Sequence, residues 1–163
     1  MTSRYRYALV GAGSRAQMYL DAIAGPHRDV AELVAWSDTN PGRLDWSLQQ
    51  AGRDALGTPA QFAVADLAAA VQQHRIDRVI ITSPDFTHAD HICTALDAGA
   101  DVIVEKPLTI SEDGVRRIAA AVERTGRNVT ITFNYRYSPR NAALKDVIAS
   151  GQIGRVTSVH FEW

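Results

Sequence analysis

A glycine-rich turn near the N-terminus holds the first residues whose types and spacing could do chemistry. Gly11 and Gly13 directly follow the apolar run Tyr5–Val10, and Ser14 and Arg15 lead into a helix-like segment. Such a turn lets the backbone approach a pyrophosphate closely. It also places the anion at the N-terminus of the next helix, where unbonded N–H groups and the helix dipole favour negative charge. Glycine pairs after a strand are common in α/β proteins, so the turn predicts a phosphate site only together with a ribose-binding partner.

Asp38 is that partner, because it closes the next apolar run, Ala31–Ser37. An acidic side chain about 20 residues beyond the glycines is where a ribose 2′-hydroxyl is held. Its charge repels a 2′-phosphate, so NAD is favoured over NADP. Arg43 leaves NADP as an alternative cofactor, since a nearby arginine can accommodate that phosphate. A second role for Asp38, as a cap of the helix that starts at Pro41, is compatible with the first.

Composition excludes several other classes of protein. The formal net charge is −1, which gives no basic field for nucleic acid, and the single cysteine cannot form an internal disulfide. No apolar run approaches the roughly 20 residues of a membrane helix, and no signal-peptide core follows the first residues. These features predict a cytoplasmic α/β domain without nucleic-acid or membrane partners.

Strand-like and helix-like segments alternate along the chain. Near-continuous β-branched runs such as 78–82 are typical of strands buried on both faces. The alternation predicts a doubly wound parallel sheet of six strands in the order 3-2-1-4-5-6, with helices on both faces. The expected strands are 5–10, 31–37, a short third strand near 61–64, 78–82, 101–104 and 129–133; the expected helices are 15–24, 41–51, 66–74, 88–98, 111–125 and 139–150.

Ligands of such sheets bind at the carboxyl ends of the strands, near the point where the strand order reverses. Five loops lie there, and all of them carry polar or special residues. We therefore expect the chemistry at one edge of the sheet, in loops 11–16, 38–41, 83–88, 105–107 and 134–139.

His88 and His91 stand three residues apart with acidic neighbours, which raises the question of a metal site. Two ligands on one helical turn without a clustered third are a weak signal. His88, at the expected start of a helix, is predicted to face cofactor or substrate through a hydrogen bond, with simple local capping as the alternative.

Several motifs together resemble the glucose–fructose oxidoreductase / inositol dehydrogenase (Gfo/Idh/MocA) family. The tripeptide Glu105-Lys106-Pro107 at the end of the fifth strand is far more specific than the glycines. The resemblance covers essentially the whole chain and implies the family's NAD(P)-binding Rossmann domain. The other matching segments are Gly11-Ala-Gly13-Ser-Arg15, Thr82-Ser83-Pro84-Asp-Phe-Thr-His88, Asn134-Tyr-Arg136-Tyr-Ser-Pro139 and Gly151-Gln-Ile-Gly154.

The resemblance also implies roles for individual residues. Lys106 would stand near the nicotinamide ribose and the substrate hydroxyl, Glu105 would orient its loop, and Asn134 would lie near the nicotinamide. The Lys106–Pro107 peptide bond is expected to be cis. The full set of expected cofactor-binding positions is Gly11, Gly13, Ser14, Arg15, Asp38, Arg43, Ser83, Pro84, His88, Glu105, Lys106 and Asn134.

Lys106 also has a physical argument of its own as a catalytic residue. An ammonium at a strand's carboxyl end, close to a bound alcohol, stabilises the alkoxide that develops as hydride leaves. The competing interpretation is a solvated surface lysine beside a proline.

Relatives in the resembled family continue into a second domain that carries the substrate site. We expect residues 1–150 to form the dinucleotide-binding domain and 151–163 to begin the second domain, with an amphipathic segment, 156–163, that exposes Phe161 and Trp163. Such a segment invites pairing between copies of the chain, or stays poorly ordered. The chain alone is then expected to bind NAD weakly and to oxidise no sugar or polyol, because a small-molecule substrate needs the second domain.

Two other classes of function stay open. One is a non-catalytic protein that senses NAD(P). The other is an S-adenosylmethionine-dependent methyltransferase, because a glycine-rich turn with an acidic second-strand end also suits that cofactor; the Glu105-Lys-Pro sequence argues against it.

Overall fold

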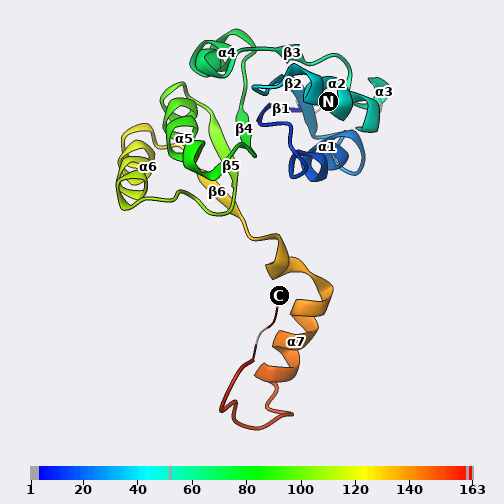
Figure 1. Cartoon of the computed structure of the whole chain (residues 1–163), viewed down its shortest axis with the longest axis vertical. Helices are drawn as coiled ribbons and strands as arrows, with labels where there is room; N and C mark the ends of the chain where they lie inside the picture. Colours follow the sequence, from blue (N-terminus) through cyan, green and yellow to red (C-terminus); the bar gives the residue numbers. More distant parts are fainter. Residues whose placement is uncertain (1–3, 52, 161, 163) are drawn as a thin grey trace. The chain divides into compact units, whose positions relative to one another are not determined.

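A computed structural model describes residues 4–51, 53–160 and 162. The chain divides into two compact units, Met1–Thr132 and Phe133–Trp163. The first unit is an α/β domain, and the described residues of the second unit include a 3-10 turn followed by an α-helix (Figure 1). The assignment of residues 1–150 to a single dinucleotide-binding domain stays a prediction.

The first unit is built on one six-stranded sheet in the order β3-β2-β1-β4-β5-β6, and each neighbouring pair is parallel. This confirms the predicted topology. The third strand is shorter and earlier than expected, because Val64 already begins a 3-10 turn, η1 (Val64–Asp66). The strands are β1 (Tyr5–Val10), β2 (Ala31–Ser37), β3 (Ala60–Gln61), β4 (Arg78–Ile81), β5 (Asp101–Glu105) and β6 (Val129–Thr132).

Helices follow the strands in the expected alternation. Ser111 caps α6, because its hydroxyl accepts a hydrogen bond from the Gly114 amide at 3.0 Å, and Gly126 ends that helix in the left-handed conformation. The helices of the first unit are α1 (Ala16–Ala24), α2 (Pro41–Ala51), α3 (Arg53–Leu56), α4 (Leu67–Gln73), α5 (His88–Asp97) and α6 (Glu112–Thr125), with a 3-10 turn, η2 (Asp85–Thr87), before α5.

Two apolar clusters pack against opposite faces of the sheet. Along β1, Ala8 and Val10 belong to the cluster with α4, α5 and α6, whereas Tyr7 and Leu9 belong to the cluster with α1, α2 and α3. Successive side chains of a strand point to opposite faces, so this alternation shows that both faces are covered. The central strands are therefore buried on both sides, which explains their continuous apolar sequence.

The second unit holds a 3-10 turn, η3 (Asn134–Tyr137), and α7 (Pro139–Ala149). Residues 156–160 form neither helix nor strand and are exposed. The described part of the amphipathic segment 156–163 thus forms no strand, and its pairing between copies of the chain stays a prediction. Phe161 and Trp163, on which the expected pairing of copies depends, lie outside the described residues.

Among the described residues, no helix combines the length and the apolar character needed to cross a bilayer.

Candidate functional site

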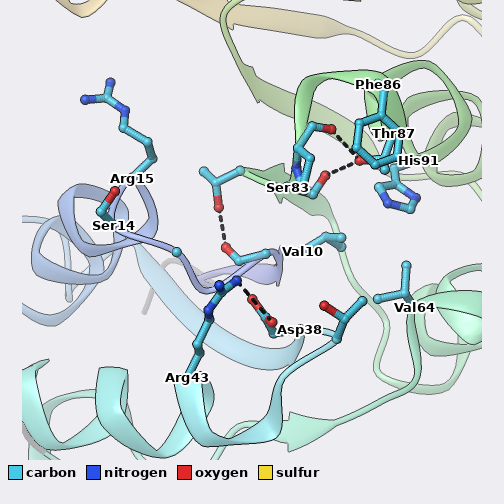
Figure 2. A pocket seen from close by; sticks show the side chains of 15 residues that line it. Val10, Ser14, Arg15, Asp38, Arg43, Val64, Ser83, Phe86, Thr87 and His91 are labelled. Atoms are coloured by element: carbon cyan, nitrogen blue, oxygen red, sulfur yellow. Dashed lines mark hydrogen bonds and ion pairs between the residues drawn. The ribbon is translucent and has the colours of Figure 1, made fainter.

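A cavity of about 580 Å³ lies where β1, β2 and β4 end. These are the loops at which the strand order reverses, and they hold most of the expected ligand positions (Figure 2). The lining residues are Val10, Gly11, Gly13, Ser14, Arg15, Asp38, Thr39, Arg43, Val64, Thr82, Ser83, Pro84, Phe86, Thr87 and His91.

Gly11 is where the first turn touches the end of β4. Its φ is +94°, and a Cβ added there would lie 2.6 Å from the Ser83 amide nitrogen and 2.8 Å from the Thr82 carbonyl carbon. The contact is held by the Thr82 hydroxyl, which donates to the Gly11 carbonyl. The Gly11 amide donates to the Ser37 carbonyl at 2.8 Å, so this glycine joins three strand ends.

Gly13 differs from Gly11 because the space in front of it is open. A Cβ added at Gly13 meets no atom within 4 Å, and the residue lines the cavity. Its carbonyl accepts from the Ala16 amide at 3.0 Å as α1 begins, and within the described residues no side chain caps that helix. A helix N-terminus without a cap, behind a glycine that exposes its backbone, suits a bound anion.

Asp38 anchors the glycine-rich turn. One carboxylate oxygen accepts from the Ala12 amide at 2.7 Å and the other from the Asn40 amide at 2.7 Å. The side chain is only 3% exposed. Each carboxylate oxygen has a second lone pair, so the group can also accept from a ligand hydroxyl. The predicted capping role of Asp38 is not observed, because the side-chain oxygen of Asn40 accepts from the Gly42 amide of α2 at 3.0 Å, whereas Asp38 orients the glycine-rich turn and the segment before the helix.

Arg43 lies beside Asp38, with Nη1 3.7 Å from its Oδ1 (Figure 2). The arginine is about half exposed although the Asp38 side chain is buried, and their 3.7 Å separation is longer than a hydrogen bond. The guanidinium is therefore free to turn toward a ligand phosphate.

The loop after β4 forms the opposite wall. The Ser83 and Thr87 hydroxyls are 2.7 Å apart, and Thr87 also donates to the Pro84 carbonyl at 2.7 Å. Phe86 is 70% exposed and His91 lies next to it in Figure 2. Burial lowers the pKa of His91, a shift that Asp90 opposes and His88 reinforces.

Several residues that line the cavity are not among the residues that the sequence predicts to bind the cofactor. The rule about strand ends pointed to the loops of Thr39, Phe86 and Thr87, whereas the other four lie in segments expected to be strand or helix, and only the folded backbone shows that they face the cavity. These residues are Val10, Thr39, Val64, Thr82, Phe86, Thr87 and His91.

His88 does not have the expected place. It is fully buried and is not among the described residues that line the cavity. Its Nδ1 is 2.8 Å from the Pro107 carbonyl oxygen and its Nε2 is 2.9 Å from the Ser83 carbonyl oxygen. The prediction that His88 faces cofactor or substrate is therefore wrong, because tertiary contacts use both ring nitrogens; helix capping is not its role either, since Thr87 occupies the N-cap position.

Glu105 is also buried and is not among the described residues that line the cavity. Its carboxylate accepts two bonds of 3.1 Å from Arg15 Nη2 and bonds of 3.0 Å from the Tyr19 and Thr132 hydroxyls. Burial disfavours its charge, but these donors outweigh burial, so the pKa of Glu105 lies below its ordinary value. Burial, opposed by Thr132 and aided by the Glu105 charge, raises the pKa of Tyr19 to about 12. Arg15, which lines the cavity, is thus tied to the residue preceding Lys106.

This cluster predicts a loss of stability in acid. A carboxyl group whose pKa is lowered by folding stabilises the folded state above its unfolded pKa, and that contribution disappears as pH falls through the folded value. We expect the free energy of unfolding of Glu105→Gln to depend less on pH below about 4.5 than that of the unchanged chain. Urea titrations at several pH values, with the exposed Glu112→Gln as control, measure the difference; identical slopes for both variants would contradict the prediction.

Lys106 is exposed and follows β5, and the Lys106–Pro107 bond is cis, as predicted. Lys106 is not among the described residues that line the cavity. Asn134 belongs to the second unit, in η3. The roles expected for Lys106 and Asn134 stay predictions.

Within residues 4–51, 53–160 and 162, no three or more His, Cys, Asp or Glu side chains are grouped so as to hold a metal ion.

Comparison with known proteins agrees with this geometry. Residues 5–133 match the model of the "Oxidoreductase family, NAD-binding Rossmann fold". An inositol 2-dehydrogenase of Rubrobacter xylanophilus is 30% identical over 156 residues, 94% of this chain and 42% of that protein. The chain therefore spans less than half the length of this curated relative.

The similar solved structures include examples with bound ligands. Scyllo-inositol dehydrogenase from Lactobacillus casei, with NAD(H) and scyllo-inositol, has a TM-score of 0.77 at 25% identity, over 95% of this chain and 44% of that one. The WlbA dehydrogenase from Bordetella pertussis, with NADH and UDP-GlcNAcA, has a TM-score of 0.76 at 29% identity. The match covers 94% of this chain and 44% of that one. The sheet order, the glycine-rich turn and the family match lead to one conclusion: this chain belongs to the Gfo/Idh/MocA oxidoreductase family and corresponds to its NAD-binding Rossmann domain.

Proposed function

We propose that this chain binds a nicotinamide dinucleotide, with NAD(H) preferred over NADP(H), as the cofactor-binding part of an oxidoreductase that acts on CH–OH groups. The observation that carries the proposal is the shared cavity of the Gly11–Gly13 turn, the α1 N-terminus and Asp38. Its residues fit the ligand: open space faces Gly13, and the Asp38 carboxylate borders the cavity.

Each end of the cavity suits a different part of the ligand. The Gly13 and Ser14 backbone at the start of α1 would hold the pyrophosphate. Asp38 would accept from the ribose hydroxyls while it keeps its bonds to the Ala12 and Asn40 amides. Val10, Val64 and Phe86 offer apolar surface for a flat ring.

The bound nicotinamide would supply the hydride acceptor. Lys106, at the end of β5, would lie where an ammonium stabilises the negative charge that grows on a substrate alcohol oxygen. Glu105 and Arg15 would hold the start of that loop, because their ion pair connects it to the phosphate turn.

The substrate class follows from relatives only. The two ligand-bound structures hold a cyclitol and a nucleotide sugar, both of which carry secondary hydroxyl groups. We propose a sugar, polyol or related alcohol as substrate of the complete enzyme. The 163-residue chain itself should bind NADH weakly without oxidising such alcohols, because hydride transfer needs a substrate held in near-attack geometry.

Titration of the chain with NADH, NADPH and S-adenosylmethionine, followed by nicotinamide fluorescence and calorimetry, tests the proposal. We expect NADH to bind at least about tenfold more tightly than NADPH, a difference of roughly 1.4 kcal/mol from repulsion between Asp38 and the 2′-phosphate. Tighter binding of NADPH would show that Arg43 decides the preference. If the chain binds S-adenosylmethionine and neither dinucleotide, the oxidoreductase assignment is rejected.

A panel of sugars and inositols, assayed with NAD, tests the second part of the proposal, that this chain alone does not oxidise alcohols. Measurable turnover by this chain would contradict the expected need for a further domain. NADH binding without turnover in a full-length relative carrying this domain would instead favour a sensor.

A further inference from the structure

His88 joins two loops at the carboxyl edge of the sheet. It is the first residue of α5 and is fully buried. One ring nitrogen meets the carbonyl of Ser83, in the loop after β4, and the other meets the carbonyl of Pro107, in the loop after β5. A single side chain therefore contacts the backbone of both loops.

The chemical identity of the two acceptors restricts which nitrogens of the His88 ring carry a proton. Carbonyl oxygens can only accept, and a neutral imidazole has only one N–H to donate. With Nδ1 at 2.8 Å and Nε2 at 2.9 Å from these oxygens, both contacts are hydrogen bonds only when each nitrogen carries a proton. Otherwise one ring lone pair faces a carbonyl oxygen in a place closed to solvent, which is costly.

Charged residues stand close to His88 in sequence and on the segments that follow its two partners. Asp90 and His91 follow on α5, and the Arg117 guanidinium of α6 donates to Asp90 at 2.6 Å. Lys106 directly precedes Pro107 and Asp85 belongs to η2. None of these groups is a hydrogen-bond partner of the ring, whose two contacts within the described residues are the Ser83 and Pro107 carbonyls.

We infer that His88, held as a doubly protonated imidazolium between the Ser83 and Pro107 carbonyls, is a positioning residue that fixes the Lys106 loop relative to the Ser83–Pro84 wall of the cofactor cavity. The importance of this spacing rests on the proposed function, because Ser83 and Pro84 line the cavity and Lys106 is the proposed charge-stabilising group. The protonation of the ring itself does not depend on that proposal.

Nuclear magnetic resonance of the ¹⁵N-histidine-labelled chain tests the ring directly. At pH 7 we expect one of the five histidines to show protons on both ring nitrogens, with slow exchange against water. That signal should vanish in His88→Gln and persist in the matched control His27→Gln, whose histidine is exposed. A His88 ring with one protonated nitrogen would overturn the inference.

Two variants test the positioning role. A glutamine amide has two N–H donors and can serve both carbonyls, whereas methionine has a similar volume and none. We expect His88→Gln to keep the NADH dissociation constant within about threefold and His88→Met to raise it about tenfold or more, the effect of roughly 1.4 kcal/mol from two lost hydrogen bonds. Equal affinity in His88→Met and the unchanged chain would refute the role.

Circular dichroism shows whether each variant is folded. If His88→Met does not fold, the NADH affinity of His88→Gln and the ring measurement test the inference. Failure of the unchanged chain to bind NADH would reject the proposed function while the ring measurement still stands, so the two failures are distinguishable.

Discussion

Replacing Gly11 with alanine is expected to cost the domain a large part of its stability. The new Cβ would lie 2.6 Å from the Ser83 amide nitrogen and 2.7 Å from its Cα, both backbone atoms that cannot rotate away. The φ of +94° adds strain, because L side chains rarely adopt it. Strained backbone costs about 1–3 kcal/mol and overpacking a similar amount, so a loss of roughly 2–6 kcal/mol in the free energy of unfolding is expected.

Urea unfolding followed by circular dichroism measures this loss, and Gly13→Ala is the matched control. No atom lies within 4 Å of a Cβ at Gly13, so its unfolding free energy should change by no more than about 1 kcal/mol. The same methyl group projects where a pyrophosphate would approach, so NADH affinity should fall by about tenfold or more. If Gly13→Ala binds NADH normally, the phosphate is not at this turn; if Gly11→Ala is as stable as the unchanged chain, the close contact with β4 is not rigid.

Asp38→Ala should weaken NADH binding by about 10- to 100-fold and weaken NADPH binding much less. The carboxylate would accept from the ribose hydroxyls, and hydrogen bonds to a charged group contribute about 1.5–3 kcal/mol. NADPH gains from removal of the repulsion with its 2′-phosphate, so the ratio of the two affinities should narrow. Fluorescence titrations with both dinucleotides measure this ratio.

The same substitution removes the acceptors of the Ala12 and Asn40 amides, so it should also lower stability. Asp38→Asn separates the two effects, because its amide oxygen keeps one acceptor while the charge is lost. We expect Asp38→Asn to recover part of the stability and to leave the affinity ratio narrowed. An unchanged ratio in both variants would exclude Asp38 from the ribose site.

The order of the sheet could be predicted from the sequence because each of its causes is local. β-branched runs form strands, helical segments between them force parallel pairing, and the handedness of the crossovers leaves few arrangements. The turn at Gly11 and Gly13 and the acidic end of β2 at Asp38 were predictable for the same reason. Their positions relative to a strand end already place them at one edge.

The contacts that join distant segments could not be predicted in this way. Arg15 meets Glu105 across 90 positions of sequence, and His88 takes its partners from Ser83 and Pro107, so the identity of a polar residue does not reveal what it touches. His88 looked like a ligand-facing group because it stands at a helix start in a functional loop. The sequence thus determined which strand ends form the site, through local pattern and spacing, whereas only tertiary packing decided which polar side chains face the cavity and which hold its walls together.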